Sequence, residues 1–526
     1  MRKKQDVEGD APERPEIILG LVGALGTPLS EVADRIQVAF DRVGYKCHEL
    51  RLSTLLKNLS GDGFKDVELV PVPEDKRLAS YMAAGTHLRT ITNRGDVLAG
   101  LAMGWIRNLR PATEGDEREP NAATVYLLNS LKHPHEIATL RRAYAKHFVS
   151  VGVYTKRDLR VHNVARDIGT SSGIPQTEKL RSLAEDLIAT DQEEENKPLG
   201  QKVRDAFPLC DYFINASYPA SIEDQINRLI RILFLHPFVT PLIDEYGMFH
   251  AHASARRSGA LSRQVGAAIT SEIGDVLAVG MNEVPKAGGG HYWEGDPEDA
   301  RDYALGFDQN KKMSRTAIRQ VLLAMQKRQW LCEGRVAQNI DNLVMDALLP
   351  DGPLHDSMLT NITEYGREVH AEMSAIVTAA RLGTKIGGAT LYTTTFPCHN
   401  CAKHIVAAGI KRVVYIEPYS KSFAGEFHLD SITLDDPSCS HGKVLFEPFS
   451  GVAPRNYMSW FDSQGRKDEE GKALHWNPRS SQPRFTYVDP GYLPRERDIM
   501  REIYAVLSDQ KVELKQELET DDEEKD

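Results

Sequence analysis

Two short stretches decide the fold of the second half of this chain: His370-Ala-Glu372-Met-Ser-Ala-Ile-Val377 and Phe396-Pro-Cys398-His-Asn-Cys401-Ala-Lys-His-Ile-Val406. One histidine and two cysteines at this spacing are typical of a metal site, and a carboxylate follows the histidine by two residues. Apolar residues after Glu372 recur at helical spacing. We therefore expect His370 and Glu372 at the N-terminal end of a buried helix.

The residues around the two cysteines predict a strand followed by a helix. The strand covers 390–395 and runs into Pro397, whose fixed φ suits the first position of a helix over 398–408. Cys398 and Cys401 are three residues apart, so both sulfurs should lie on one face of its first turn, where the helix dipole favours thiolates. Two helix N-termini should thus converge on one metal.

This arrangement predicts a catalytic zinc site with His370, Cys398 and Cys401 as the metal ligands. Three protein ligands leave the fourth position of Zn²⁺ for water, whose pKa then falls to about 7. Glu372 lies close enough to accept the proton of that water and to pass it on to a substrate ring and a departing amine. A purely structural zinc site would need a fourth ligand and would have no use for Glu372.

Length and composition indicate a folded protein of two domains. The chain has 526 residues, 41% hydrophobic and 26% charged, and it contains no apolar stretch long enough to cross a membrane. Its basic first residues precede no apolar segment, so we expect a cytoplasmic protein. Six scattered cysteines do not suggest a disulfide framework. The net charge of −11 argues weakly against a non-specific nucleic-acid binder.

The N-terminal half opens with a polar segment, 1–15, that we expect to be disordered, and continues with the layout of a phosphate-binding loop. An apolar strand, a glycine-rich turn and a helix start follow one another over 16–30. Pro28 and Leu29 replace the second glycine and the lysine of the usual motif. Three interpretations stay open: a plain turn, nucleotide binding without catalysis, or a working kinase. The candidate nucleotide-binding residues are Gly23, Gly26, Thr27 and Ser30.

Strands and helices alternate from residue 16 to about residue 230, which predicts a doubly wound parallel sheet. Candidate strands lie within 44–53, 123–129, 148–153 and 204–214. In layout more than in motif, residues 16–230 resemble the P-loop kinase fold. We therefore expect a degenerate P-loop kinase-like, nucleotide-binding domain in this α/β half.

The H-x-E and P-C-x-x-C pair is the signature of zinc deaminases, and the surrounding residues, over 248–435, closely resemble deoxycytidylate deaminases. The stretches that carry the resemblance are Ala255-Arg-Arg-Ser258, Arg263-Gln-Val-Gly-Ala267, Asn282-Glu-Val-Pro285 and the two motifs above. The resemblance implies a three-layer α/β/α fold, sugar contact by Asn282 and a phosphate near Arg263. An ordinary structural role is the alternative for both residues, since an asparagine after a strand is usually a turn residue.

We expect this zinc-dependent domain to cover 231–508, with an insertion over 286–365 and a C-terminal extension, before an acidic tail over 509–526. A kinase-like domain fused to such a domain resembles the bacterial anti-phage dCTP/dCMP deaminases. That resemblance implies conversion of dCTP and dCMP to dUTP and dUMP, gating by a regulatory nucleotide or inhibitor on the N-terminal domain, and a homo-oligomer. The alternatives are a base deaminase of tRNA or single-stranded DNA, and a nucleotide-sensing scaffold.

Overall fold

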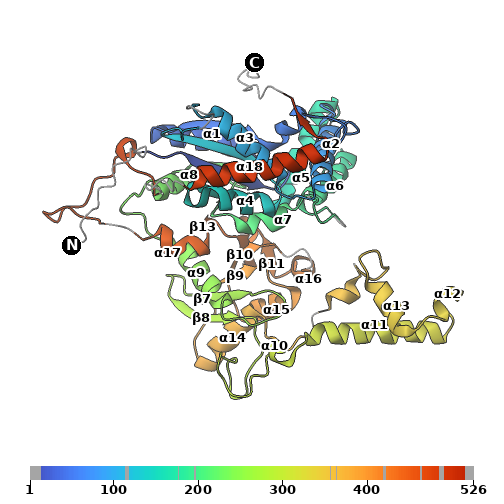
Figure 1. Cartoon of the computed structure of the whole chain (residues 1–526). Helices are drawn as coiled ribbons and strands as arrows, with labels where there is room; N and C mark the ends of the chain where they lie inside the picture. Colours follow the sequence, from blue (N-terminus) through green and yellow to red (C-terminus); the bar gives the residue numbers. More distant parts are fainter. Residues whose placement is uncertain are drawn as a thin grey trace. The chain divides into compact units, whose positions relative to one another are not determined.

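The computed structural model describes residues 14–112, 118–175, 177–194, 197–355, 357–362, 364–418, 422–462, 465–484 and 491–515 (Figure 1). The chain forms two compact units. Unit 1 consists of Met1–Pro241 with Ser450–Asp526, and unit 2 is Leu242–Phe449. Residues 1–13 of the segment predicted to be disordered, 1–15, lie outside the described residues, as do residues 516–526 of the predicted acidic tail, 509–526. No described helix is both long and apolar enough to span a bilayer.

Unit 1 is built on a sheet in which five strands are parallel. Their order is β2 (Lys46–Arg51), β4 (Thr124–Leu131), β1 (Ile17–Gly23), β5 (Phe148–Tyr154) and β6 (Tyr212–Asn215). On one side of β1 the chain first places β2 at the edge and then inserts β4 between β2 and β1, and on the other side β5 and β6 follow outward in order. The predicted parallel, alternating α/β arrangement is confirmed. In such sheets ligands bind beyond the carboxyl ends of the strands, where the strand order reverses.

Helices cover both faces of this sheet. On one face, α1 (Leu29–Arg42) and α8 (Pro219–Leu233) share a core with alternate residues of β1 and β4. On the other, α3 (Val97–Leu109) places the Trp105 ring 6.1 Å from that of Tyr126 on β4, and it packs with α4 (Pro134–Tyr144) and α18 (Tyr492–Asp509). Three further helices, α2 (Glu74–Thr92), α5 (Arg157–Ser172) and α6 (Glu178–Gln192), pack against one another.

The expected C-terminal boundary was wrong, because residues after Phe449 belong to unit 1 and not to the zinc-containing domain. The strand β13 (Gly451–Val452) pairs antiparallel with β6. Helix α18 approaches α3 at Gly100, where a Cβ would lie 2.1 Å from Ile503. Helix α18 ends at Asp509, and β14 (Glu513–Leu514) then pairs with β3 (Leu59–Ser60).

A buried charge network also holds α18 in unit 1. The Arg110 guanidinium contacts Glu16 at 2.6 Å and Glu496 at 2.7 Å, and the Tyr492 hydroxyl donates to Glu16 at 2.8 Å. All three charged side chains are almost fully buried. A buried ion pair of this kind is costly to break, because removal of one partner leaves an uncompensated charge. Partners so far apart in sequence could not be matched from local patterns.

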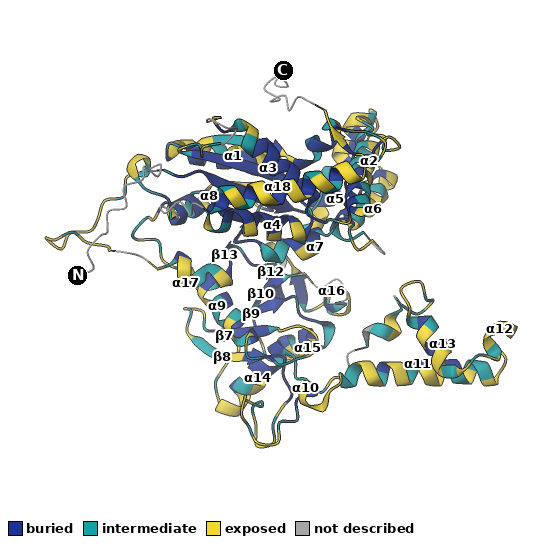
Figure 2. Cartoon of the chain, in the orientation of Figure 1, coloured by how far each residue is buried: buried dark blue, intermediate teal, exposed yellow. Residues whose placement is uncertain are grey.

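Unit 2 is a mixed sheet between helices. A hairpin forms from β8 (Val276–Met281) and β7 (Gly266–Thr270), with β8 at the edge of the sheet. Beyond β7 lie β9 (Thr390–Thr395), β10 (Arg412–Glu417), β12 (Val444–Pro448) and β11 (Ile432–Leu434), in that order. From β9 onward the strands are parallel. Figure 2 shows the buried residues gathered in the sheets of both units.

Two glycines on the hairpin mark the helix layers of unit 2. A Cβ at Gly266 would meet the Ala251 carbonyl of α9 (Ile243–Ala255) at 2.0 Å. A Cβ at Gly280 would meet the Ala371 carbonyl of α14 (Ala371–Leu382) at 2.3 Å. Gly280 pairs with Ala267, the residue after Gly266. Since successive residues of a strand face opposite ways, α9 and α14 cover opposite faces, as three layers require.

The predicted insertion is largely helical. It contains α10 (Asp302–Leu305), α11 (Gln309–Lys327), α12 (Glu333–Val336) and α13 (Ile340–Leu348). Apolar residues of α11 and α13, among them Ile318, Leu322 and Leu343, form a small core of their own. This part of unit 2 therefore folds as a helical hairpin.

Candidate active site

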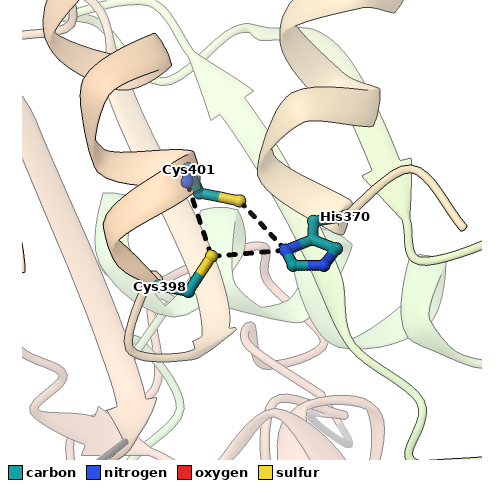
Figure 3. A group of neighbouring side chains, drawn as sticks. All are labelled: His370, Cys398 and Cys401. Carbon is teal, nitrogen blue, oxygen red and sulfur yellow. Dashed lines mark hydrogen bonds between the residues drawn. The ribbon is translucent and has the colours of Figure 1, made fainter. Parts of the chain in front are cut away.

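Two helix N-termini bring the predicted metal ligands together in unit 2 (Figure 3). His370 is the residue before α14, and Cys398 is the residue before α15 (His399–Ala407). The Nδ1 atom of His370 lies 3.3 Å from Cys398 Sγ and 3.4 Å from Cys401 Sγ. Cys398 Sγ also accepts a hydrogen bond from the Cys401 amide at 3.4 Å, which fixes it at the start of the helix.

The donor set fits zinc. The three ligand atoms lie within 4.8 Å of one another, and within the part of the chain that the structure describes they form the one group suited to a metal ion. Tetrahedral Zn²⁺ with nitrogen and sulfur ligands holds them roughly 3.5 Å apart, given bond lengths of about 2.0 and 2.3 Å. Hydrogen bonds from Cys401 and His370 lower the pKa of the Cys398 thiol to about 4, which favours the thiolate that binds metal.

Glu372 lies beside the cluster without belonging to it. Its side chain is only 4% exposed, and its Oε2 accepts from the Cys401 thiol at 3.4 Å. Burial raises the pKa of this carboxyl above its usual value. A carboxyl with a raised pKa, next to a metal site, is suited to accept and return a proton near neutral pH.

The sheet positions these groups through close helix packing. Because Gly280 has no side chain, β8 can lie directly against the first turn of α14, which carries His370 and Glu372. Apolar contacts fix α15 on the same face, since Cys401, Ala402 and Ile405 are fully buried in the core of unit 2. The order strand, turn, helix that the sequence predicted for 390–408 is confirmed.

The cluster opens into a cavity of about 410 Å³ within unit 2. Sequence reasoning missed part of its wall, which consists of Gly366 and of five residues from the insertion: Asp302, Asp308, Asn310, Thr360 and Ile362. The sequence predicted only an insertion over 286–365, and nothing in this stretch indicated that its residues would line the pocket. The buried Oδ1 atom of Asn310 has no hydrogen-bond partner among the described residues.

Four carboxyl groups line this cavity: Asp302, Asp308, Glu368 and Glu372. Burial, together with the charges of Asp302, Glu283 and Asp308, raises the pKa of Glu368 to about 7. The cationic residue of the wall is Arg263, which is half exposed and lies 3.2 Å from Glu417. The cavity is therefore acidic near the zinc ligands and has one guanidinium among its lining groups.

Asn282 and Arg263, the two predicted substrate residues, both line the cavity. The amide of Asn282 accepts from the Val265 backbone at 2.7 Å and donates to the Arg263 carbonyl at 2.8 Å. Asn282 thus holds the segment before β7 in place, which is the turn role weighed against sugar contact. Arg263 takes its backbone position from this interaction.

The predicted nucleotide-binding residues of unit 1 follow β1. Gly26 has a φ of 84°, and a Cβ there would meet the Arg160 carbonyl at 2.5 Å, so the turn requires glycine. Ser30 lies in the first turn of α1, and its Oγ accepts from Arg51 at 3.4 Å. Gly23 ends β1, while Thr27 lines a cavity of unit 1.

One family model matches within unit 2. Residues 242–417 match the family described as the cytidine and deoxycytidylate deaminase zinc-binding region. The deoxycytidylate deaminase of Enterobacteria phage T2 is 53% identical over 58 residues, which cover 11% of this chain and 31% of the phage protein. The human deoxycytidylate deaminase is 41% identical over 96 residues, covering 18% of this chain and 45% of the human protein.

Longer matches have lower sequence identity. A probable deoxycytidylate deaminase of Drosophila melanogaster is 28% identical over 173 residues, 33% of this chain and 58% of the fly protein. The chain thus spans less than two thirds of the length of each of these relatives. The crystal structure of dCMP deaminase from the cyanophage S-TIM5 with dCMP and dUMP is 20% identical, with a TM-score of 0.22, over 40% of this chain and all of that chain.

Proposed function

We propose that this chain, whose residues 242–417 form a zinc-binding region of the cytidine and deoxycytidylate deaminase type, hydrolytically deaminates free deoxycytidine nucleotides. The observation that carries the proposal is that the ligand atoms of His370, Cys398 and Cys401 lie close enough together to bind one metal ion. Glu372 lies 3.4 Å from Cys401 and lines the same cavity. A structural zinc site would have no role for a buried glutamate beside its ligands.

Zinc, when bound by these ligands, lowers the pKa of water to about 7 and so supplies a nucleophile at neutral pH. Glu372 accepts the proton of that water and delivers it to N3 of the cytosine ring as oxygen adds to C4. The C4–N4 bond then breaks, and Glu372 gives a second proton from the added hydroxyl to the departing amine. Cytosine and water become uracil and ammonia, with the carboxylate regenerated.

The cavity supports a free nucleotide better than a nucleic acid. Its volume of about 410 Å³ lies in the range of sites for small molecules. Deaminases of single-stranded nucleic acid need a basic groove with stacking aromatic side chains, whereas four carboxyl groups and one guanidinium line this site. We infer that Arg263 contacts the phosphate of the nucleotide and Asn282 lies near the sugar.

Two features of unit 1 support a regulatory role for it. Its parallel sheet and the loop after β1 resemble a P-loop kinase in layout, yet Leu29 stands where the catalytic lysine would be. Loss of that cation removes the main charge beside a transferred phosphate. We infer that unit 1 binds a nucleotide or inhibitor without turnover and gates the deaminase, which consumes dCTP and dCMP and thereby depletes cytosine deoxynucleotides during phage infection.

Ammonia release by the zinc-loaded full-length protein tests the proposal. The substrates are dCTP, dCMP, CTP, cytidine and a single-stranded oligonucleotide, and the variants are Glu372→Ala and, as a matched exposed control, Glu272→Ala. We expect turnover of dCTP or dCMP that only Glu372→Ala abolishes. Turnover of the oligonucleotide alone would favour the nucleic-acid alternative, and turnover that survives Glu372→Ala would exclude the proposed chemistry.

A further inference from the structure

A second cavity, of about 260 Å³, lies in unit 1 where the parallel strands end. Residues that follow β1, β2 and β4 line it, together with residues of α2, α5 and α6. Its position is the one at which open α/β sheets bind ligands. Nothing in the zinc chemistry of unit 2 uses this cavity.

Three buried polar atoms that belong to the wall of this cavity have no hydrogen-bond partner among the described residues: Arg89 Nη2, Gln201 Oε1 and Thr27 Oγ1. Arg89 is 1% exposed and Gln201 is 4% exposed. Burying polar atoms without partners is costly, and native proteins satisfy nearly all of them. Each of these three wall residues thus has one buried polar atom for which a bound ligand would have to supply the partner.

The rest of each side chain is fixed. Arg89 Nε donates to the Leu199 carbonyl at 2.9 Å, and its Nη1 lies 3.8 Å from Glu136. Gln201 Nε2 donates to the Met82 carbonyl at 3.3 Å. Gly85 keeps the space beside both groups open, because a Cβ there would lie 3.7 Å from the Arg89 guanidinium and 3.6 Å from the Gln201 amide. The unpartnered atoms are thus held in place before any ligand arrives.

The loop after β1 is already occupied by an anion of the chain itself. Asp191, which is 1% exposed, accepts from the Leu25 amide at 2.7 Å and from Lys132 Nζ at 2.8 Å. Lys132 also donates to the Gly23 carbonyl at 3.0 Å. Lys132, which follows β4, therefore lies near the loop whose motif lacks the usual lysine. The carboxylate of Asp191 neutralises the charge of Lys132. The negative charge of a ligand must be met elsewhere.

The charged side chains of the cavity wall indicate which groups can meet the negative charge of a ligand. Five basic and three acidic side chains line the cavity, and the acidic ones pair as Arg77–Glu74 at 2.6 Å, Lys132–Asp191 at 2.8 Å and Arg166–Asp167 at 3.0 Å. Arg51 has no ion pair with a lining carboxylate, and Arg89 lies 3.8 Å from Glu136, which is not part of the wall, and keeps its Nη2 without a partner among the described residues. Guanidinium groups are well suited to phosphate oxygens, which accept two hydrogen bonds at once.

We propose that this cavity binds the phosphate of a phosphorylated ligand such as a nucleotide, with Arg89 and Arg51 as its cationic anchors and Gln201 as an acceptor for a ligand hydroxyl. The proposal rests on the proposed regulatory role of unit 1 and names the residues that carry it. Thr27 contributes its hydroxyl, whereas the backbone of the loop stays bonded to Asp191. Binding involves no bond making or breaking in the ligand.

Calorimetric titration of the full-length protein with pyrophosphate and with ATP tests this site, and the two probes separate free phosphate chemistry from nucleotide binding. We expect saturable binding that Gln201→Glu weakens by more than about tenfold, because it adds a buried negative charge beside the phosphate. Arg51→Gln, an exposed substitution that spares the fold, should weaken binding several-fold. Arg42→Gln, an exposed arginine of α1 outside the cavity, should bind like the unmodified chain.

Absence of binding of either probe at millimolar concentration, or binding unchanged in both Gln201→Glu and Arg51→Gln, would overturn the proposal. Ammonia release from dCMP is measured on the same preparations. A preparation that deaminates dCMP but binds neither probe would contradict the unit 1 site alone, whereas one that binds both probes in the expected manner without deamination would contradict the proposed activity of unit 2 alone.

Discussion

The zinc cluster of unit 2 and the cavity of unit 1 both lie where strands end, yet their polar groups are arranged in opposite ways. In unit 2, His370, Cys398 and Cys401 converge on one point at 3.3 to 3.4 Å, which suits an ion. In unit 1 most charges are paired with each other, and the buried Arg89 keeps one unpartnered nitrogen. Convergence of ligand atoms indicates a metal, whereas isolated leftover donors and acceptors indicate a larger molecule that spans them.

We expect the largest loss of activity from a substitution that removes a ligand of the zinc cluster. We expect Cys398→Ala to abolish zinc binding and to reduce deamination below detection, because the lowering of the water pKa from 15.7 to about 7 is lost. Zinc content by mass spectrometry and ammonia release report the two effects. Cys332→Ala, an exposed cysteine of the insertion, is the matched control and should keep both. Full activity of Cys398→Ala would show that it is not a ligand.

Removing the metal should separate the two regions. Dialysis against a strong chelator should abolish deamination reversibly and leave pyrophosphate binding unchanged, since no residue of the unit 1 cavity belongs to the zinc cluster. Calorimetry and ammonia release on one preparation give both results. Loss of pyrophosphate binding together with zinc would place the anion at the zinc site instead.

A third prediction concerns Arg110, a buried arginine of unit 1. Arg110 contacts two carboxylates at 2.6 and 2.7 Å and is a structural residue, unlike Arg89. Arg110→Met should lower the free energy of unfolding by about 3 to 5 kcal/mol, because it leaves Glu16 and Glu496 buried without their cation. Urea denaturation measures this. Arg42→Gln should cost at most about 1 kcal/mol; equal losses in both variants would contradict a structural role for the network.

The smallest effect concerns the insertion. Asn310→Ala removes the unpartnered Oδ1 from the wall of the zinc cavity and the 2.7 Å bond that its amide donates to the Ile362 carbonyl. We expect KM for the nucleotide to rise roughly tenfold or less, the value of one buried hydrogen bond, with kcat little changed. Steady-state kinetics with Lys311→Ala as an exposed control on the same helix will show it. An unchanged KM would exclude Asn310 from substrate contact.

The same contrast explains how much the sequence could predict. The metal ligands and Glu372 lie in two motifs whose local strand and helix patterns are strong, so spacing alone placed them together. The parallel sheet of unit 1 was also predictable, because its strands are apolar and separated by helices. By contrast, Arg110 meets Glu496 across 386 residues, and no local pattern carries such pairing. The return of α18 to unit 1 was missed for this reason.

The two cavities were hidden in the same way. Asn310 and Asp308 look like ordinary first-turn residues of a helix, and Arg89 and Gln201 look like ordinary polar residues of a helix and a loop. Only the fold shows that all four border cavities, and that Asn310, Arg89 and Gln201 each have a buried atom without a hydrogen-bond partner among the described residues. The loop motif predicted Gly23 and Ser30 as binding residues, whereas the structure indicates Arg89 and Gln201, which belong to other elements.

A paired measurement on Glu372→Gln tests the assignment of the catalytic centre most directly. This substitution keeps the shape of the side chain and removes its ability to move a proton. We predict that this variant retains the zinc content of the unmodified protein and that its kcat for dCMP or dCTP falls by about 10²- to 10⁴-fold, the contribution of a positioned general acid and base. Loss of zinc, or deamination at the unmodified rate, would contradict the assignment of His370, Cys398, Cys401 and Glu372 as the catalytic centre.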